Sequence, residues 1–186
     1  MGARARDGRI SCYPLVHNVH RQGILSHTLA HFANEPEVLQ DHAEQAFRTV
    51  TEHLGYVGTL AIEFFVVAQS VGPQLLLNEI APRVHNSGHW SLSGANVSQF
   101  DLHIRALTGM PFPALRVQPT LMVNAIGVSE IPDTYWQDPD ADPFWYGKQP
   151  RPGRKVGHVN FRLTEPDQAH HYASQCPQQL QYLAGD

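Results

Sequence analysis

The apolar residues between positions 34 and 54 recur with the period of an α-helix. They are Leu39, Ala43, Ala46, Phe47, Val50 and Leu54. Asn34 is a favourable N-cap, and the acidic side chains after it suit the positive end of the helix dipole. Gly55 is a typical residue for a helix C-terminus. The pattern predicts a helix from Asn34 to Leu54 with one apolar face.

Two β-rich runs follow this helix. Residues 57–68 and 74–80 contain mostly aliphatic and aromatic side chains, and the segment Gln69–Pro73 between them contains the glycine and proline of a turn. We predict that the two runs pair as an antiparallel hairpin.

Shorter elements are expected on either side of the hairpin. Residues 9–16 are predicted as a strand that ends at the polar run His17–Gly23, and residues 24–32 as a second extended segment. Ser98–Asp101 has the spacing of a capping box, which predicts the start of a helix. Three apolar residues of that helix share one face: Phe100, Ile104 and Leu107.

The proline-rich segment Gly109–Pro119 is the clearest internal boundary. The tail from Glu165 has a helical composition, and we expect Pro177 to break it. Strands are predicted beyond the boundary at residues 120–126, 144–146 and 156–163. The fold class that these elements indicate is α+β.

Composition narrows the function classes. Among 186 residues, 42% are hydrophobic and 16% charged, as in ordinary globular proteins. A formal net charge of −4 argues against nucleic acid and anionic membranes as partners. Cys12 and Cys176 lie far apart, which fits a reducing compartment, and no apolar run reaches membrane-spanning length. We expect a cytoplasmic protein.

Two carboxylates stand out in the predicted hairpin. Glu63 lies inside an apolar strand, where a carboxylate is costly unless it is paired or bound to a cation. Glu79 ends the returning strand, so pairing would bring the two acids together. Mg²⁺ shared with substrate phosphates would balance their charge. The alternative is that Glu63 faces solvent on an edge strand and Glu79 caps a loop.

A dense polar loop follows Glu79. Arg83 suits a phosphate or carboxylate, or else pairs with Glu79 at the surface. The side chains of His85, Asn86, Ser87 and His89 could bind a phosphorylated ligand. A zinc cluster is the competing interpretation, although the spacing matches no common zinc motif.

A second basic element is the turn Lys148–Lys155, which carries four cations among proline and glycine. Such a turn can bind an anion through side chains and backbone amides, and we favour a phosphate. A solvated charged face is the ordinary alternative. The loop histidines His17 and His20 could contact a nucleotide, or could be part of ordinary turns.

Several segments together resemble one known family. They are Tyr13–His20 with Gly23–Leu25, Asn78–Trp90 (NEIAPRVHNSGHW), Ser98–Ala106 and Arg151–His158 (RPGRKVGH). In this order and over nearly the whole chain, they are similar to the 5-(carboxyamino)imidazole ribonucleotide synthases of purine biosynthesis, which belong to the ATP-grasp superfamily.

This resemblance implies a reaction. ATP phosphorylates bicarbonate to carboxyphosphate, the amine of 5-aminoimidazole ribonucleotide is carboxylated, and ADP and phosphate leave. It implies Glu63 and Glu79 as Mg²⁺ ligands, with Asn78 and Glu79 at the ATP phosphates. His20 matches a nucleotide contact, whereas His17 stands where many members carry Glu.

The resemblance also assigns the ribonucleotide. Arg83 matches an arginine near the transferred phosphoryl group, so Arg83 and Glu79 are the expected catalytic residues. The expected contacts to the ribonucleotide and its phosphate are Arg83, His85, Asn86, Ser87, Lys148, Arg154 and Lys155. No residue is compelling as a general base. The family is typically dimeric, which implies a homodimer.

The implied architecture is the C-terminal part of an ATP-grasp domain at residues 1–108, an antiparallel sheet with packed helices, and a small β-rich module at residues 119–186. The first half of the family's ATP-grasp fold has no counterpart, so we expect a fragment with little activity alone. The alternatives are a non-catalytic ribonucleotide-binding or assembly module and a histidine-ligated metallohydrolase.

Overall fold

The structure is a computed structural model that describes residues 1–30, 37–70 and 72–182, with the side chains of all of these except 166 and 167. The chain forms two compact units. The first unit contains the described residues of Met1–Leu15, Ala33–Leu92 and Asn96–Arg116. The second contains those of Val16–Phe32, Ser93–Ala95 and Val117–Asp186.

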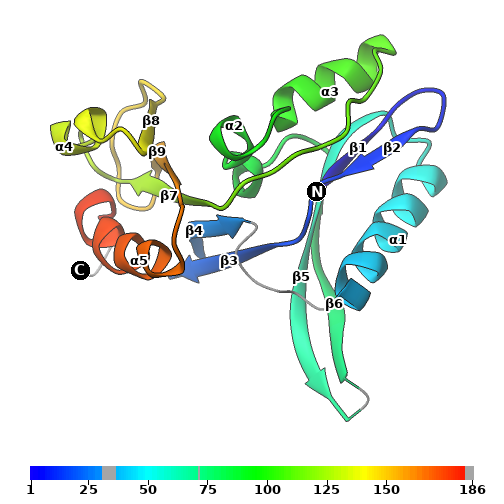
Figure 1. The fold of residues 1–186 in the computed structure, drawn as a ribbon, viewed down its shortest axis with the longest axis horizontal. Coiled ribbons are helices and arrows are strands. Elements are labelled where there is room, and N and C mark those ends of the chain that lie inside the picture. The colour runs from blue at the N-terminus through cyan, green and yellow to red at the C-terminus, as the bar shows by residue number, and fades with distance from the viewer. Residues whose placement is uncertain (31–36, 71, 183–186) are drawn as a thin grey trace. The chain divides into compact units, whose positions relative to one another are not determined.

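The first unit is built on a four-stranded antiparallel sheet in the order β2–β1–β5–β6. The strands are β1 (Gly2–Arg4), β2 (Ile10–Cys12), β5 (Gly58–Gln69) and β6 (Gly72–Ala81). Strands β5 and β6 form the long hairpin in Figure 1, which confirms the predicted pairing. β5 lies inside the sheet and β6 at its edge.

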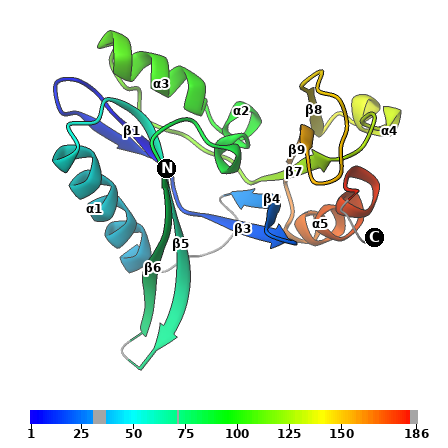
Figure 2. The same ribbon diagram turned by 180° about the vertical axis from the view of Figure 1, so that it is seen from behind.

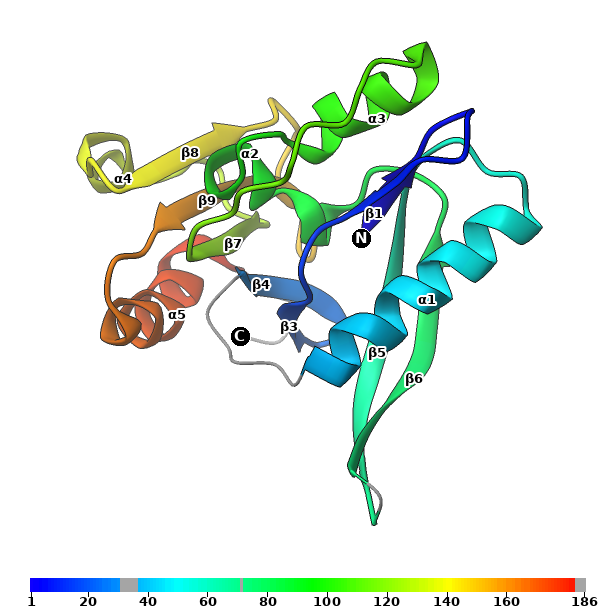
Figure 3. The same cartoon turned by 45° about the vertical axis from the view of Figure 1, so that its right-hand side comes forward.

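Two helices cover opposite faces of this sheet, α1 (Glu37–His53) and α3 (Gln99–Thr108). Thr59 of β5 donates a hydrogen bond to the Gln99 carbonyl at the start of α3, whereas Ile62 of β5 lies with Phe47 of α1. Successive side chains of a strand point to opposite faces, so the two helices lie on different sides (Figures 2 and 3). A short 3₁₀ turn (Asn86–Gly88) and α2 (Ser91–Gly94) connect β6 to α3.

The second unit has a five-stranded antiparallel sheet in the order β3–β4–β7–β9–β8. Its core forms where α5 packs on the apolar face of β7 and β9, with Leu121, Phe161 and Leu180 almost fully buried. The elements are β3 (Val16–Arg21), β4 (Ile24–Ala30), β7 (Thr120–Ile126), α4 (Asp133–Gln137), β8 (Ala141–Trp145), β9 (Lys155–Arg162) and α5 (Pro166–Leu180).

The predicted helix after residue 34 is confirmed as α1, although its proposed cap Asn34 lies outside the described residues. Leu39 and Phe47 are buried as the pattern predicts. Leu54 is 60% exposed because α1 ends before it. Gly55 has φ +57°, a left-handed conformation that glycine adopts without a steric penalty.

The predicted start of α3 is also confirmed, because the Ser98 side chain accepts a hydrogen bond from the Asp101 N–H. The face of α3 that packs on the sheet differs from the apolar face that the sequence predicts for this helix. Ile104 is 53% exposed, and Phe100 and Leu107 are exposed as well. The buried residues are Gln99, Leu102 and Ala106, because the side of α3 that meets the sheet carries a polar anchor as well as apolar residues.

The prediction of one strand over residues 9–16 is wrong. This segment divides between β2 and β3, which belong to different sheets, and the polar run after Val16 is itself strand. β3 is an edge strand, so its histidine and arginine side chains can reach solvent. Gln22 and Gly23 form the turn to β4 with φ of +49° and +75°, as two-residue hairpin turns require.

The expectation that Pro177 breaks the C-terminal helix is wrong as well, since α5 continues to Leu180. Cys176 and Leu180, on either side of the proline, are buried in the core. Their burial offsets the backbone hydrogen bond that proline cannot make. The domain limits 1–108 and 119–186 stay a prediction; the β3–β4 hairpin pairs with β7 of the second unit.

Within the described residues, no helix is both long and apolar enough to cross a membrane.

Exchange of Leu102 for alanine tests which face of α3 is buried. Leu102 is 0% exposed and Ile104, in the same helix, is 53% exposed. Leu102→Ala should lower the free energy of unfolding by roughly 2–5 kcal/mol because it leaves a cavity. Ile104→Ala should change it by less than about 0.5 kcal/mol. Urea unfolding of both variants measures this, and equal losses would contradict the assignment.

Candidate functional site

A β-bulge lies at the centre of the candidate site. Glu63 on β5 pairs directly with Glu79 on β6, and the next residue, Phe64, pairs with Leu77. Asn78 is therefore the extra residue of the edge strand. Bulges re-aim side chains and are common beside active sites. The predicted meeting of the two carboxylates is confirmed at the level of strand register.

Glu63 and Glu79 differ in their surroundings. Glu63 is on an inner strand with its side chain 13% exposed, so the alternative of a solvent-facing acid on an edge strand is wrong. Glu79 is on the edge strand and its side chain is 53% exposed. The pair thus combines one shielded acid with one that solvent and ligands can reach.

The imidazole of His85 lies between the two acids. Its Nδ1 is 3.6 Å from Glu63 Oε1, and its Nε2 is 4.0 Å from Glu79 Oε1. The Ser87 hydroxyl is 2.8 Å from the same Nδ1, and the Ser87 N–H also points to it at 3.4 Å. The structure therefore brings together four of the residues selected from the sequence: Glu63, Glu79, His85 and Ser87.

The donors present fit Mg²⁺ better than Zn²⁺. Two carboxylates on adjacent strands supply hard oxygen ligands, and Mg²⁺ commonly takes one or two such ligands together with phosphate oxygens. Across residues 1–30, 37–70 and 72–182, no three His, Cys, Asp or Glu side chains are arranged to hold a metal among themselves.

Arg83 and Asn86 complete the loop after β6. Arg83 is exposed, and its guanidinium donates a hydrogen bond to the neighbouring Val84 carbonyl at 3.0 Å. Asn86 begins the 3₁₀ turn that His85 caps. Ser87 is 7% exposed, so its hydroxyl is held inside the loop, whereas Arg83 is free to meet a ligand from solvent.

Gln99 is a residue that the sequence interpretation missed. Its side chain is fully buried and makes hydrogen bonds to the backbone of His85 and to the His89 ring. The Ser98–Asp101 motif by itself predicts only a helix cap. A polar residue at the first position of the helix, next to the cap, was the available signal.

The basic turn belongs to the second unit, between β8 and β9. Lys148 Nζ lies 5.0 Å from the centre of the Tyr146 ring. The Tyr146 hydroxyl is 2.6 Å from His158 Nδ1, and burial raises the pKa of this phenol, so it stays neutral. Arg154 is tied to the turn by hydrogen bonds to Gln149 and Arg151.

Lys155 and His20 occupy strand positions in the same unit. Lys155 is the first residue of β9 and pairs with Ile126 at a register shift. His20 lies on the edge strand β3 at another shift, opposite Leu25, and its side chain is exposed. The expected site residues are thus divided between the two units. Seven lie in the first unit, and the second contains the other four, which are His20, Lys148, Arg154 and Lys155. The seven are Glu63, Asn78, Glu79, Arg83, His85, Asn86 and Ser87.

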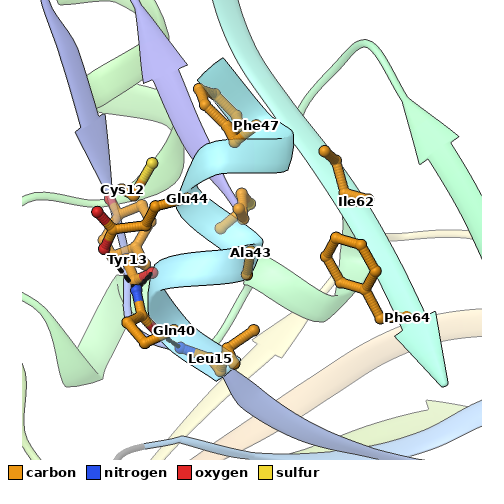
Figure 4. Close-up of a pocket in the computed structure, with 10 residues that line it drawn as sticks. Cys12, Tyr13, Leu15, Gln40, Ala43, Glu44, Phe47, Ile62 and Phe64 are labelled. Carbon is orange, nitrogen blue, oxygen red and sulfur yellow. Dashed lines mark hydrogen bonds between the residues drawn. The ribbon is translucent and has the colours of Figure 1, made fainter. Parts of the chain in front are cut away.

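A separate small pocket lies between α1 and the first sheet (Figure 4). Phe47 and Ala43 of α1 face Ile62 and Phe64 of β5 there, and Cys12 also lines the pocket. Burial raises the pKa of the Cys12 thiol to about 11. None of the expected site residues lines this pocket.

Comparison with known proteins identifies the family. A model of the ATP-grasp domain matches residues 1–100, and a model of the phosphoribosylaminoimidazole carboxylase C-terminal domain matches residues 120–172. The chain belongs to the ATP-grasp family. Its fold class, predicted as the C-terminal part of an ATP-grasp domain with a β-rich module, is confirmed by these matches and by the two antiparallel sheets.

Two curated relatives of this ATP-grasp chain have the same name. The chain is 46% identical over 168 residues to the N5-carboxyaminoimidazole ribonucleotide synthase of Escherichia coli strain K12. The alignment covers 90% of this chain and 45% of the relative. The enzyme of that name from Haemophilus influenzae is 45% identical, with 91% and 45% covered. The chain therefore spans about half the length of these relatives, and the family resemblance drawn from its motifs is confirmed.

Solved structures give the same result. The N5-carboxyaminoimidazole ribonucleotide synthetase of Thermus thermophilus matches with a TM-score of 0.87 and 41% identity, over 100% of this chain and 51% of that one. The Aspergillus clavatus N5-carboxyaminoimidazole synthase, in complex with ADP and 5-aminoimidazole ribonucleotide, matches with a TM-score of 0.81 and 29% identity. That alignment covers 96% of this chain and 49% of the other.

The raised pKa of Cys12 predicts slow chemistry at this thiol. Only the thiolate is nucleophilic, so at pH 8 alkylation of Cys12 should be roughly a hundredfold slower than that of an ordinary cysteine. The rate should rise as the pH approaches 11. Peptide mapping after timed iodoacetamide treatment measures it, with the urea-unfolded chain as the reference. Equal rates in the folded and unfolded chain would contradict the prediction.

Proposed function

We propose that this chain carries the metal-binding and ribonucleotide-binding part of an ATP-dependent ligase that carboxylates 5-aminoimidazole ribonucleotide with bicarbonate. The observation that carries the proposal is the Glu63–Glu79 pair at the β-bulge, followed by the Arg83–Ser87 loop, in a member of the ATP-grasp family. The name shared by the relatives and the ADP and 5-aminoimidazole ribonucleotide bound in one similar structure support the substrate assignment.

The proposed reaction has two steps. A bicarbonate oxygen attacks the γ-phosphorus of ATP, and ADP leaves with the electrons of the broken bond. The amine nitrogen of the ribonucleotide then attacks the carboxyl carbon of carboxyphosphate, phosphate leaves, and the amine loses a proton. Among the residues that the structure describes, none is compelling as the general base for that proton.

The residues of the first unit are proposed to have separate roles in binding and catalysis. Glu63 and Glu79 would hold Mg²⁺, which supplies positive charge to the phosphates of ATP when bound. Asn78, the extra residue of the bulge, lies beside Glu79 and is proposed to donate to the same phosphates. Arg83 places fixed positive charge beside the transferred phosphoryl group, where charge develops in the transition state. His85, Asn86 and Ser87 contact the ribonucleotide.

Residues of the second unit are proposed to bind anionic groups of the substrates. Lys148, Arg154 and Lys155 are proposed to hold the 5′-phosphate of the ribonucleotide, because rigid basic turns offer several donors to one anion. His20 is proposed as a nucleotide contact on its exposed strand edge. We further propose a homodimer as the assembly and a cytoplasmic location, which the free thiols of Cys12 and Cys176 support.

Exchange of Glu79 tests the metal assignment. Glu79→Gln keeps the shape but removes the charge, so affinity for Mg²⁺-ATP should fall by roughly tenfold, about 1.4 kcal/mol. Glu52→Gln is the matched control, since the Glu52 side chain is also 53% exposed. Calorimetry with Mg²⁺-ATP on the wild type and both variants measures this. Ribonucleotide binding without Mg²⁺-ATP binding by the wild type would instead indicate the non-catalytic module.

Exchange of Lys148 tests the phosphate assignment. Lys148→Met removes one cation from the turn, so the affinity for 5-aminoimidazole ribonucleotide should fall by roughly five- to tenfold. The affinity for the riboside, which lacks the phosphate, should stay the same. Both ligands are titrated calorimetrically at two salt concentrations. A loss of affinity that is the same for riboside and ribonucleotide would refute the role of Lys148.

A further inference from the structure

Gln99 holds the backbone of His85 through two hydrogen bonds. Gln99 is the first residue of α3 and is 0% exposed. Its side-chain oxygen accepts from the His85 N–H at 2.8 Å, and its side-chain nitrogen donates to the His85 carbonyl at 2.8 Å. The amide thus satisfies both polar backbone groups of one residue, as a neighbouring strand would.

The same side-chain amide also donates a hydrogen bond to His89. The Gln99 nitrogen lies 2.7 Å from His89 Nδ1. An amide nitrogen can only donate, so Nδ1 accepts and His89 carries its proton on Nε2. The His89 ring also stacks on Phe100 of α3 at 5.6 Å. One side chain therefore fixes both ends of the segment from His85 to His89.

Gln99 is itself fixed to β5. The Thr59 hydroxyl of β5 donates to the Gln99 carbonyl at 3.2 Å, and the Gln99 N–H donates to the Ser91 hydroxyl at 3.0 Å. Ser91 in turn donates to the Gly88 carbonyl at 2.6 Å. Strand β5 also carries Glu63, so the acid and the loop that faces it share one rigid support.

We propose that Gln99 is a positioning residue that sets the conformation of the His85–Ser87 segment for the ribonucleotide. This inference rests on the proposed function, which assigns the ribonucleotide to His85, Asn86 and Ser87. Without the amide, the His85 N–H loses the Gln99 oxygen, and the His85 carbonyl, which also accepts from the Gly88 N–H, loses the Gln99 donor. The segment then gains conformations that do not bind. The binding-competent fraction falls, and the apparent affinity falls with it.

Two substitutions separate positioning from general stability. Gln99→Glu keeps the shape and the acceptor for the His85 N–H, but it presents an acceptor to the His85 carbonyl and to His89 Nδ1. Thr51→Val is the matched control, because it removes a buried hydrogen bond within α1, on the other face of the sheet, and leaves the bonds of Gln99 intact. If Gln99→Glu does not fold, Gln99→Asn replaces it, since this shorter amide cannot reach both groups.

Two measurements are made on the full 186-residue chain. Nitrogen-15 NMR of the imidazoles reports which nitrogen of His89 carries the proton, without any ligand. Calorimetry gives the affinity for 5-aminoimidazole ribonucleotide. We expect the Gln99 variant to change the His89 signal and to lower the affinity for the ribonucleotide by roughly tenfold. Thr51→Val should leave the His89 signal unchanged and alter the affinity by no more than about twofold.

Each outcome decides the inference. Equal losses of affinity in the Gln99 and Thr51 variants overturn it, because the effect is then one of general stability. Wild-type affinity in the Gln99 variant, with an altered His89 signal, also overturns it. A wild-type chain that shows the expected His89 tautomer but does not bind the ribonucleotide refutes the proposed function and the ligand role of the segment. The hydrogen bonds from Gln99 to His85 and His89 are still supported in that case.

Discussion

Two carboxylates that face each other across paired strands repel, and the first unit depends on how this repulsion is compensated. Glu63 and Glu79 are direct partners in the register of β5 and β6. The His85 imidazole lies between them and offers a polar ring to both. A divalent cation with the phosphates of a nucleotide would compensate the pair more strongly, which supports the proposal that this pair binds a metal ion.

The rigid reference for the site is the inner strand β5. It is paired on both sides, and it carries Glu63 directly. Through Thr59 it also fixes Gln99 and, with Gln99, the loop that follows β6. Buried hydrogen bonds of this kind are costly to leave unmade, so they specify one loop conformation where apolar packing alone would allow several.

Much of the fold could be predicted from periodicity and caps. The α1 helix, the β5–β6 hairpin and the Ser98 cap depend on neighbours in sequence, and the structure has all three. The failures depend on distant partners. The polar run after Val16 is strand because it pairs with β4 at a sheet edge, and Pro177 stays within α5 because flanking residues are buried. Propensity yields to tertiary contacts in both cases.

The sequence alone determined the family motifs, the two acids and the basic turn, because residue type and order decide which chemistry is available. Only the tertiary structure decided that an extra residue at Asn78 aligns Glu79 with Glu63, and that a buried amide from α3 holds His85. Strand register and long-range hydrogen bonds join residues far apart in the chain. Their geometry is set by the packing of whole elements, which no local pattern of residues contains.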